Sequence, residues 1–343
     1  MGTKLDALMK DANKKAKEEI VSLGLNSYNY SRIPFTSPEM NYCTFGGIPV
    51  GKITEFFGEE HGGKTTSALD IISNYQVMPD AKDVFYVDAE NRLDVEWAKK
   101  LNVEVDRMYI MQPKEQSAEE IFQLVYDAVS SGEVGLWVID SLGVLLSESE
   151  TEKDMDEVSV GGISKPLTKF GKKIIGPMAR TSCTGIAINQ FRDKIGARFP
   201  TKVTVGGNGW RYYCSARLEF ARGKFLDEKG NELTRGADNP VGNVVDMVME
   251  KNSTCPPTRR IGRYTINYEY GVDYLRDLIN VAIKYDIVQK SGAWFELVDV
   301  ETGELLCPDK IQGQANVYTY LEEHEDTLLA VEQAVNAKIG ILH

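Results

Sequence analysis

The chain has 343 residues, enough for about two domains of ~150 residues, so it is long enough for a large core and an appendage and is not a mini-protein. With 42% hydrophobic and 26% charged residues it has the composition of a globular protein, which excludes disordered and fibrous classes. The 51 acidic residues outnumber the 39 basic ones, and the net charge of −12 by itself argues against nucleic acid as a partner.

The N-terminal segment MGTKLDALMKDANKK is charged throughout and lacks the apolar block of a signal peptide, so we expect a cytoplasmic protein. The longest apolar stretch, residues 134–146, is interrupted by Asp140 and Ser141, which predicts no membrane span. The cysteines are odd in number and widely spaced, and the chain has only three histidines. This pattern argues against a disulfide framework and against a zinc site.

Apolar residues recur at three- and four-residue steps between Leu5 and Ile20, which predicts an amphipathic helix. A polar, tyrosine-containing stretch follows, and we interpret residues 1–31 as an N-terminal oligomerisation helix with its linker. Such a helix folds back on its own domain or docks on a neighbouring subunit, and periodicity does not distinguish the two.

From residue 52 to about residue 188, short β-rich runs alternate with helical segments. The expected strands are residues 53–57, 83–88, 108–111, 135–140 and 185–189. The segment 117–131 begins with a capping box made by Ser117 and Glu120. Alternating strands and helices predict an α/β fold, a mostly parallel twisted sheet with helices on both faces. Ligands of such sheets bind at the carboxyl ends of the strands.

Further strands are expected at residues 216–220, 244–249 and 264–268, and a helix at residues 275–285. Small β and helical pieces follow to the end of the chain. We therefore predict a core domain over residues 32–270 and a small α+β C-terminal domain over residues 271–343.

Residues 58–65 read GEEHGGKT and fit the pattern G-x-x-x-x-G-K-[ST] between a strand and a helix. In this motif the backbone N–H groups surround phosphate oxygens, Lys64 reaches the β/γ-phosphates, and the Thr65 hydroxyl binds Mg²⁺. The motif predicts ATP and Mg²⁺ as cofactors. The predicted contacts are Gly58, Glu59, Glu60, His61, Gly62, Gly63, Lys64, Thr65 and Thr66.

Carboxylates follow two of the other predicted strands. Asp140 ends the apolar run GLWVID and is the expected Mg²⁺ partner of Thr65. Asp88 and Glu90 follow the run FYVD. We select Glu90 as the group that orients the attacking water, with Asp88 as the alternative, because only geometry decides which carboxylate reaches it.

The stretch 189–213 carries five basic residues and one acidic residue, a local net charge of +4 in a chain of −12. Aromatic residues and glycines are interleaved with the charges, as in loops that follow phosphates and stack on bases. The alternative is a solvated surface loop. The basic residues are Arg192, Lys194, Arg198, Lys202 and Arg211.

A second group of basic residues, Lys165, Lys169, Lys172 and Lys173, follows the Gly161-Gly162 loop. Their spacing places most of them on one face of a helix. We add Lys165, Lys169 and Lys172 to the residues that are candidates for binding a nucleic-acid backbone.

The order of the motifs GEEHGGKTT, FYVDAENRLD, WVIDS, INQFRDKIG, TVGGNGWRYYCSARLE, KSGAWF and KIQGQAN resembles the RecA family of homologous-recombination ATPases. Within it the chain looks most like the bacteriophage recombinases of the UvsX kind. The resemblance covers about residues 30–325. It implies a RecA-type ATPase core with two DNA-binding loops, at about 152–164 and 191–207.

The resemblance also implies an activity: a DNA-dependent ATPase that forms a homo-oligomeric helical filament on single-stranded DNA and exchanges strands with a homologous duplex. A single-strand binding protein and a loader are further partners that it suggests. Two other functions stay open at this point, a RecA-fold DNA helicase or motor and a passive single-strand coat protein.

Residue roles follow from the same resemblance. Glu90 looks like the residue that orients the water, and Gln190 looks like the glutamine that senses the γ-phosphate. Asp94 and Trp97 fall where the family contacts adenine, although Trp97 is equally suited to a helix core. These residues, with Lys64, make the implied nucleotide and catalytic site.

Three more positions match the family at its subunit interface and DNA contacts. Lys251 matches a lysine that reaches the next subunit's ATP, Tyr212 matches an aromatic residue that inserts into the neighbour, and Arg211 matches a basic position. Ser253 stands where the family has a second interface lysine. The first DNA loop is acidic, which weakens any grip on phosphate by charge.

Overall fold

The computed structural model describes residues 4–17, 21, 31–151, 162–193, 202–234, 236–299 and 302–339. The chain divides into two units, Met1–Ser31 and Arg32–His343. The first contains helix α1 (Lys4–Ala16), which buries no residue and exposes Leu5 and Leu8. The predicted helix over residues 5–20 is therefore present to Ala16, and its last residues lie largely outside the described part.

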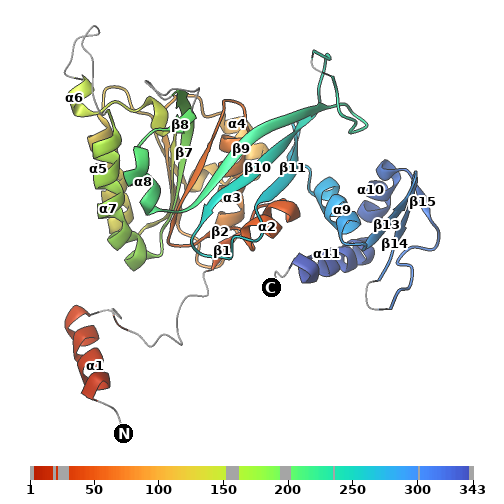
Figure 1. Cartoon of the computed structure of the whole chain (residues 1–343), viewed down its shortest axis with the longest axis horizontal. Helices are drawn as coiled ribbons and strands as arrows, with labels where there is room; N and C mark the ends of the chain where they lie inside the picture. The colour runs from red at the N-terminus through yellow and green to blue at the C-terminus, as the bar shows by residue number, and fades with distance from the viewer. Residues whose placement is uncertain are drawn as a thin grey trace. The chain divides into compact units, whose positions relative to one another are not determined.

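A sheet of ten strands, counted over the described residues, forms the centre of the second unit (Figure 1). Its order is β12-β11-β10-β9-β3-β7-β6-β4-β5, and β8 pairs with β7. The strands are β3 (Ile53–Gly58), β4 (Asp83–Asp88), β5 (Met108–Met111), β6 (Val134–Asp140), β7 (Thr184–Asp193), β8 (Lys202–Thr204), β9 (Cys214–Leu226), β10 (Gly242–Asn252), β11 (Ile261–Asn267) and β12 (Gly271–Val272).

Neighbours from β9 to β5 pair in parallel, whereas β10, β11 and β12 extend the sheet as antiparallel strands. The prediction of a mostly parallel α/β sheet is confirmed. The run 135–140 is apolar on both faces because helices cover both sides of β6, as parallel sheets require.

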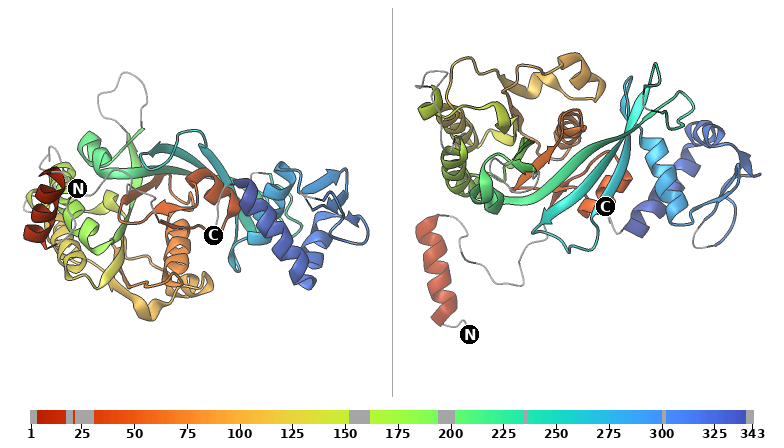
Figure 2. Two further views of the ribbon diagram at one scale, coloured as in Figure 1. Left: turned by 90° about the horizontal axis from the view of Figure 1, so that it is seen from below. Right: turned by 45° about the horizontal axis from the view of Figure 1, so that its top comes forward.

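Helices pack on both faces of this sheet (Figure 2). On one face lie α2 (Pro38–Thr44), α3 (Lys64–Gln76) and α4 (Val95–Lys100). On the other face lie α5 (Ala118–Ser131), α7 (Ser164–Thr181) and α8 (Gly207–Tyr213). Successive residues of β6 alternate between the two cores: Leu136 and Val138 face the first, Trp137 and Ile139 the second.

The remaining short elements connect the layers. They are β1 (Arg32–Ile33), β2 (Ile48–Pro49), the 3-10 turns at Val105–Arg107 and Leu142–Val144, and α6 (Glu148–Thr151). The predicted capping box is present at α5, where the Ser117 hydroxyl accepts from the Glu120 N–H and the Glu120 carboxylate accepts from the Ser117 N–H.

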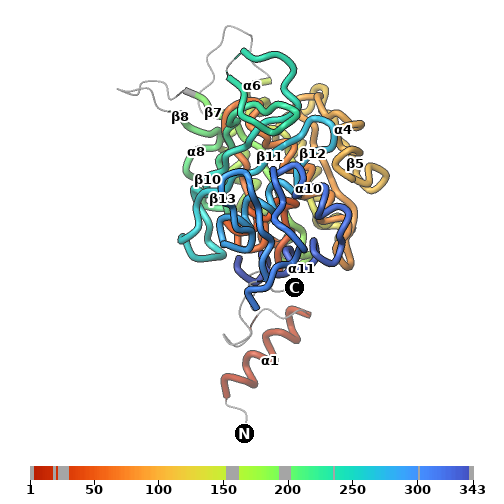
Figure 3. Tube along the Cα trace, turned by 90° about the vertical axis from the view of Figure 1, so that its right-hand side faces the viewer, coloured from red at the N-terminus to blue at the C-terminus, as the bar shows by residue number. Residues whose placement is uncertain are grey.

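The C-terminal part has a hydrophobic core of its own and lies beyond the β10–β12 end of the sheet (Figures 1 and 3). It contains α9 (Tyr274–Lys284), β13 (Val288–Ser291), β14 (Trp294–Leu297), β15 (Ile311–Gln312), α10 (Gln314–Glu323) and α11 (Glu325–Ile339). Lys284 and Glu39 join α9 to α2 by an ion pair of 2.9 Å. Among the described residues, no helix is both long enough and apolar enough to span a membrane.

Candidate active site

The loop between β3 and α3 contains two glycines at positions where a side chain would clash and where the backbone φ is positive. Gly58 has a φ of +146°, and a Cβ there would lie 2.1 Å from the Phe220 carbonyl oxygen. Gly63 has a φ of +91°, and its Cβ would lie 2.9 Å from the Val245 side chain. Gly63 is also the N-cap of α3, and no side chain caps this helix. The N–H groups of the first turn are therefore available to an anion, as a phosphate-binding loop requires.

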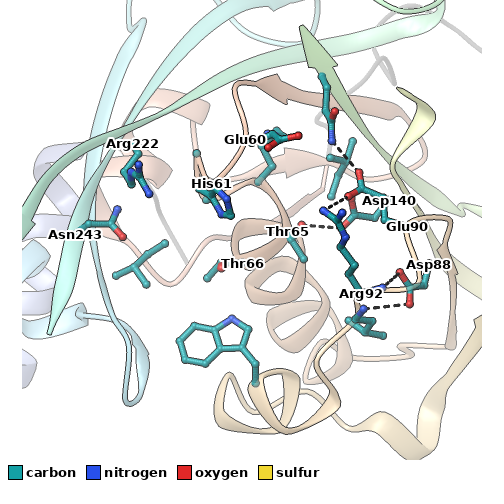
Figure 4. Close-up of a pocket in the computed structure, with 18 of the residues that line it drawn as sticks. Glu60, His61, Thr65, Thr66, Asp88, Glu90, Arg92, Asp140, Arg222 and Asn243 are labelled. Atoms are coloured by element: carbon teal, nitrogen blue, oxygen red, sulfur yellow. Dashed lines mark hydrogen bonds and ion pairs between the residues drawn. The ribbon is translucent and has the colours of Figure 1, made fainter. Parts of the chain in front are cut away.

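A cavity of about 500 Å³ opens over this loop (Figure 4). It receives side chains from the phosphate-binding loop and α3, from the ends of β4, β6 and β7, and from β9 to β11. The lining residues are Glu60, His61, Gly62, Gly63, Lys64, Thr65, Thr66, Asp88, Glu90, Arg92, Leu93, Trp97, Asp140, Ile188, Gln190, Arg222, Asn243, Ile266 and Tyr268. Most of the predicted nucleotide contacts thus lie together at the carboxyl ends of the parallel strands.

Lys64 is buried, and its ammonium donates to the carbonyl oxygens of Glu59 at 2.5 Å and Gly58 at 3.3 Å. Burial lowers the pKa of Lys64, while the charge of Asp140 opposes this shift. The ammonium group is held over the loop by backbone oxygens alone, so it can turn toward a phosphate without breaking an ion pair.

The predicted magnesium partners are in direct contact. The Thr65 hydroxyl donates to Asp140 Oδ2 at 2.7 Å, and the Tyr86 hydroxyl donates to the same oxygen at 2.9 Å. Burial raises the pKa of Asp140, and the hydrogen bonds from Thr65 and Tyr86 oppose it. A hydroxyl and a carboxylate beside a phosphate-binding loop are oxygen ligands of the kind that Mg²⁺ prefers.

Asp88 and Glu90 have different partners. The buried Asp88 carboxylate accepts from the backbone N–H groups of Arg92 at 3.0 Å and Leu93 at 3.1 Å. It also accepts from the Gln112 amide at 3.0 Å. Asp88 thus holds the loop after β4 in shape, whereas Glu90 is directed to the ends of β6 and β7.

Glu90 connects the cavity to the β7–β8 hairpin. Its Oε1 accepts from the Ser141 hydroxyl at 2.7 Å and from Gln190 Nε2 at 2.8 Å. The side-chain oxygen Gln190 Oε1 accepts from Arg192 Nη1 at 3.3 Å, and Arg192 Nη2 donates to the backbone carbonyl of Gly143 at 3.1 Å. A continuous chain of hydrogen bonds therefore runs from a carboxylate in the cavity to a predicted DNA-binding arginine.

The adenine candidates are placed differently from each other. Trp97 is half-buried, packs against the core and also lines the cavity, so both readings of it fit its position. The Asp94 carboxylate accepts from the Trp97 N–H at 3.0 Å as the N-cap of α4, and Asp94 does not line the cavity.

The far wall of the cavity comes from β9 to β11, and sequence reasoning missed it. Arg222 and Asn243 lie across the cavity from Asp88 and Asp140 (Figure 4). The Tyr268 hydroxyl donates to Asn243 Oδ1 at 2.9 Å. These residues carry no motif, and β9, β10 and the end of β11, which come late in the core domain, bring them to the site.

The basic residues of the second loop are only partly described. Arg192 and Lys202 stand on the two strands of the β7–β8 hairpin, where Arg192 pairs with Val203. Lys202 makes a close ion pair with Glu59 of the phosphate-binding loop. Lys194 and Arg198 lie outside the described residues.

The other DNA candidates are split between two helices. Lys165, Lys169 and Lys172 are exposed on α7, while the first predicted loop lies outside the described residues up to residue 161. Arg211 of α8 is half-buried, and its guanidinium donates to the Thr204 hydroxyl at 3.5 Å.

The interface candidates lie on α8 and β10. The Tyr212 side chain is 81% exposed. The Lys251 ammonium donates to the backbone carbonyls of Arg211 at 2.8 Å and Tyr212 at 3.4 Å. Lys251 is not among the residues that line the cavity of its own chain.

A buried polar cluster at the base of the hairpin was also missed. Arg217 and Glu55 form an ion pair at 2.5 Å with almost no exposure of either side chain. The second oxygen of Glu55 accepts from Asn189 at 2.8 Å and from the Trp210 indole N–H at 3.1 Å. The Asn189 amide oxygen accepts from the N–H of Val205, at the far end of the hairpin. Both ends of the hairpin are thereby tied to one buried carboxylate.

The family model described as RecA N-terminal domain matches residues 3–273, and the RecA C-terminal domain matches residues 276–340. The chain belongs to the RecA family. It is 34% identical to Protein RecA of Paracoccus denitrificans over 297 residues, 86% of this chain and 78% of the relative. It is 32% identical to Protein RecA of Staphylococcus carnosus over 341 residues, 98% of this chain and 90% of the relative. As a RecA-family protein it is an ATP-dependent recombinase and a DNA-dependent ATPase.

Proposed function

We propose that this chain binds ATP with Mg²⁺, assembles on single-stranded DNA as a homo-oligomeric helical filament, and exchanges strands with a homologous duplex. The observation that carries the proposal is the hydrogen-bonded series Glu90, Gln190 and Arg192, which joins the nucleotide cavity to the base of the β7–β8 hairpin. A passive coat protein has no use for such a connection, and a helicase is not favoured by the family.

In the nucleotide site, the first turn of α3 and Lys64 bind the phosphates, with the other residues of the loop 58–66 around them. Thr65 and Asp140 would hold Mg²⁺, which neutralises phosphate charge when bound. Glu90 orients the attacking water by accepting a hydrogen bond from it. Trp97 lines the cavity on the side where we place the adenine, and Asp94 caps the helix that carries Trp97.

Coupling to DNA runs through Gln190. The amide donates to Glu90 in the present arrangement, and a γ-phosphate in the cavity would compete for this donor. When Gln190 turns to the phosphate, Arg192 loses its hydrogen bond to the Gln190 side chain and is held only by the backbone carbonyls of Phe191 and Gly143, from which DNA can displace it. Nucleotide state thereby changes the affinity of the hairpin for DNA.

We further propose that ATP lies between adjacent subunits, with Lys251 reaching the neighbour's nucleotide and Tyr212 inserting into the neighbouring surface. The exposure of Tyr212 and the position of Lys251 away from its own cavity support this arrangement. Because Ser253 stands where the family resemblance implies a second lysine, only Lys251 would contact the neighbour's nucleotide. We assign residues 1–31 to docking on the neighbour, 32–270 to the ATPase core and 271–343 to the C-terminal domain.

The DNA contacts that we propose lie on the two loops and on α7. They are Lys165, Lys169, Lys172, Arg192, Lys194, Arg198, Lys202 and Arg211. Homology is tested by base pairing, so little sequence preference is expected. We place the protein in the cytoplasm, that of the host bacterium if a bacteriophage of the UvsX kind encodes it, and we propose a single-strand binding protein and a loader as partners.

Electron micrographs of the protein with single-stranded DNA and a non-hydrolysable ATP analogue test the proposal. We expect continuous helical filaments, and joint molecules when a homologous duplex and ATP are added. Discrete rings with unwinding of a forked duplex would identify a motor instead. DNA binding that keeps its full affinity in Lys64→Ala and ignores nucleotide would identify a coat protein.

A further inference from the structure

A second cavity, of about 270 Å³, lies between the phosphate-binding loop and the β7–β8 hairpin. Its lining residues are Gly58, Glu59, Glu60, Gln190, Phe191, Arg192 and Lys202. The hairpin contributes two cationic side chains to it, and the loop contributes two carboxylates. The cations could bind an anionic ligand, but carboxylates of the same chain already lie beside them.

Glu59 connects the two sides of this cavity. Its carboxylate forms the close ion pair with the Lys202 ammonium, and its backbone carbonyl accepts from the Lys64 ammonium at 2.5 Å. The same residue therefore touches the lysine assigned to the ATP phosphates and a lysine assigned to DNA. The hydrogen bond from Lys202 lowers the pKa of Glu59, so the carboxylate is ionised at neutral pH.

The groups beside this pair are those that bind single-stranded nucleic acid. Lys202 lies 5.9 Å from the centroid of the Phe191 ring, and Arg192 stands on the same hairpin. A cation beside an aromatic ring can hold a backbone phosphate while a base stacks on the ring. The Glu59 carboxylate has two acceptor oxygens and pairs with the Lys202 ammonium as a phosphate of DNA would.

We propose that the Glu59–Lys202 ion pair is an internal competitor for the DNA phosphate, so that Glu59 restrains single-stranded DNA binding until the phosphate-binding loop and the hairpin separate. The proposal rests on the DNA-binding function proposed above. The pair is solvent-exposed on both sides, 66% for Glu59 and 54% for Lys202, so DNA can displace it at small cost. A movement of the phosphate-binding loop would then reach the hairpin by two routes, the Glu59–Lys202 ion pair and the hydrogen bond of Gln190 to Glu90.

The test compares Glu59→Gln, Lys202→Gln and the double variant by fluorescence anisotropy of labelled single-stranded DNA, without nucleotide and over a salt series. Glu59→Gln is expected to bind about two- to fivefold more tightly than the unaltered protein, the range set by exposed ion pairs. Its log–log salt slope should steepen by about 0.7, one additional phosphate contact. In the Lys202→Gln background, the same change should produce no gain.

Glu133→Gln changes an exposed residue between α5 and β6, outside both cavities, makes the same change in net charge and serves as the control. An equal gain from Glu59→Gln with and without Lys202 would show simple repulsion of DNA by a carboxylate and would overturn the proposal, as would no gain at all. If the unaltered protein fails to bind DNA even with an ATP analogue, the proposed function itself is wrong. Unfolding curves of each variant confirm that the fold is retained.

Discussion

At the scale of single residues, the structure separates two carboxylates that the sequence leaves as alternatives. Asp88 accepts hydrogen bonds from two backbone N–H groups and from the Gln112 side-chain amide. Glu90 accepts hydrogen bonds from Ser141 and Gln190. Sequence position predicts that both follow β4, but their partners come from other strands and depend on the fold. The geometry supports Glu90 as the group that orients water.

Exchange of each carboxylate for its amide should therefore have different effects. Glu90→Gln is expected to lower ATP turnover by about 10²- to 10⁴-fold with little loss of stability, because it removes a proton acceptor. Asp88→Asn is expected to lower the free energy of unfolding by about 1–3 kcal/mol, because it weakens charge-assisted hydrogen bonds. Phosphate release and urea unfolding measure the two quantities. The reverse pattern would assign the catalytic role to Asp88.

Asp70 of α3 should make stability depend on pH. Its side chain is buried, and it accepts from the Thr36 N–H at 3.0 Å. Burial raises its pKa to about 6, above the ~3.9 of an unfolded chain. The folded state then binds more protons between these values, so this contribution to stability is complete below about pH 4 and is lost as pH rises to about 6.

Asp70→Asn keeps an acceptor for Thr36 and removes the titration. At pH 7.5 its free energy of unfolding should exceed that of the unaltered protein by about 2–3 kcal/mol, since each pKa unit corresponds to ~1.4 kcal/mol. Relative to the unaltered protein, the difference should vanish near pH 4. Urea unfolding at pH 4, 5, 6 and 7.5 measures it, and a difference that is constant with pH would contradict the assignment.

At the scale of elements, the β7–β8 hairpin is held by the buried pair of Glu55 and Arg217. Glu55→Gln leaves the Arg217 guanidinium buried, with the part-exposed Glu250 as its remaining carboxylate. We expect a loss of about 3 kcal/mol in the free energy of unfolding, as for a broken buried pair. Glu96→Gln, which removes the exposed Glu96–Lys99 pair, should cost under ~0.5 kcal/mol. Equal losses in the two variants would show that burial does not matter here.

Some elements of the fold and site can be predicted from the sequence and others cannot. The parallel strands and the loop 58–65 were predictable, because apolar runs and glycine spacing are local properties of the chain. The wall formed by Arg222, Asn243 and Tyr268 was not, since it depends on strands pairing with partners distant in sequence. The buried Glu55 gives no signal because a glutamate within ITEFF resembles a surface residue.

At the scale of the whole molecule, the charge of −12 is an average over a chain in which residues 189–213 have a local net charge of +4. Because the filament that we propose adds such a stretch with every subunit, binding to single-stranded DNA should depend steeply on protein concentration. Tyr212→Ala is expected to weaken DNA binding and make the anisotropy curves less steep, because it removes the exposed side chain that we propose inserts into the neighbouring subunit. Val77→Ala, an exposed apolar position elsewhere, should leave them unchanged. A hyperbolic curve for the unaltered protein would contradict cooperative assembly.

The central claim is that nucleotide state reaches DNA through Gln190. The most direct measurement is the dissociation constant for single-stranded DNA with ADP and with a non-hydrolysable ATP analogue, in the unaltered protein and in Gln190→Ala. For the unaltered protein we predict a ratio of the two constants of about 5 to 150, the usual range of coupling between two sites. For Gln190→Ala we predict a ratio near one with nucleotide still bound. A ratio unchanged by the substitution would contradict the account.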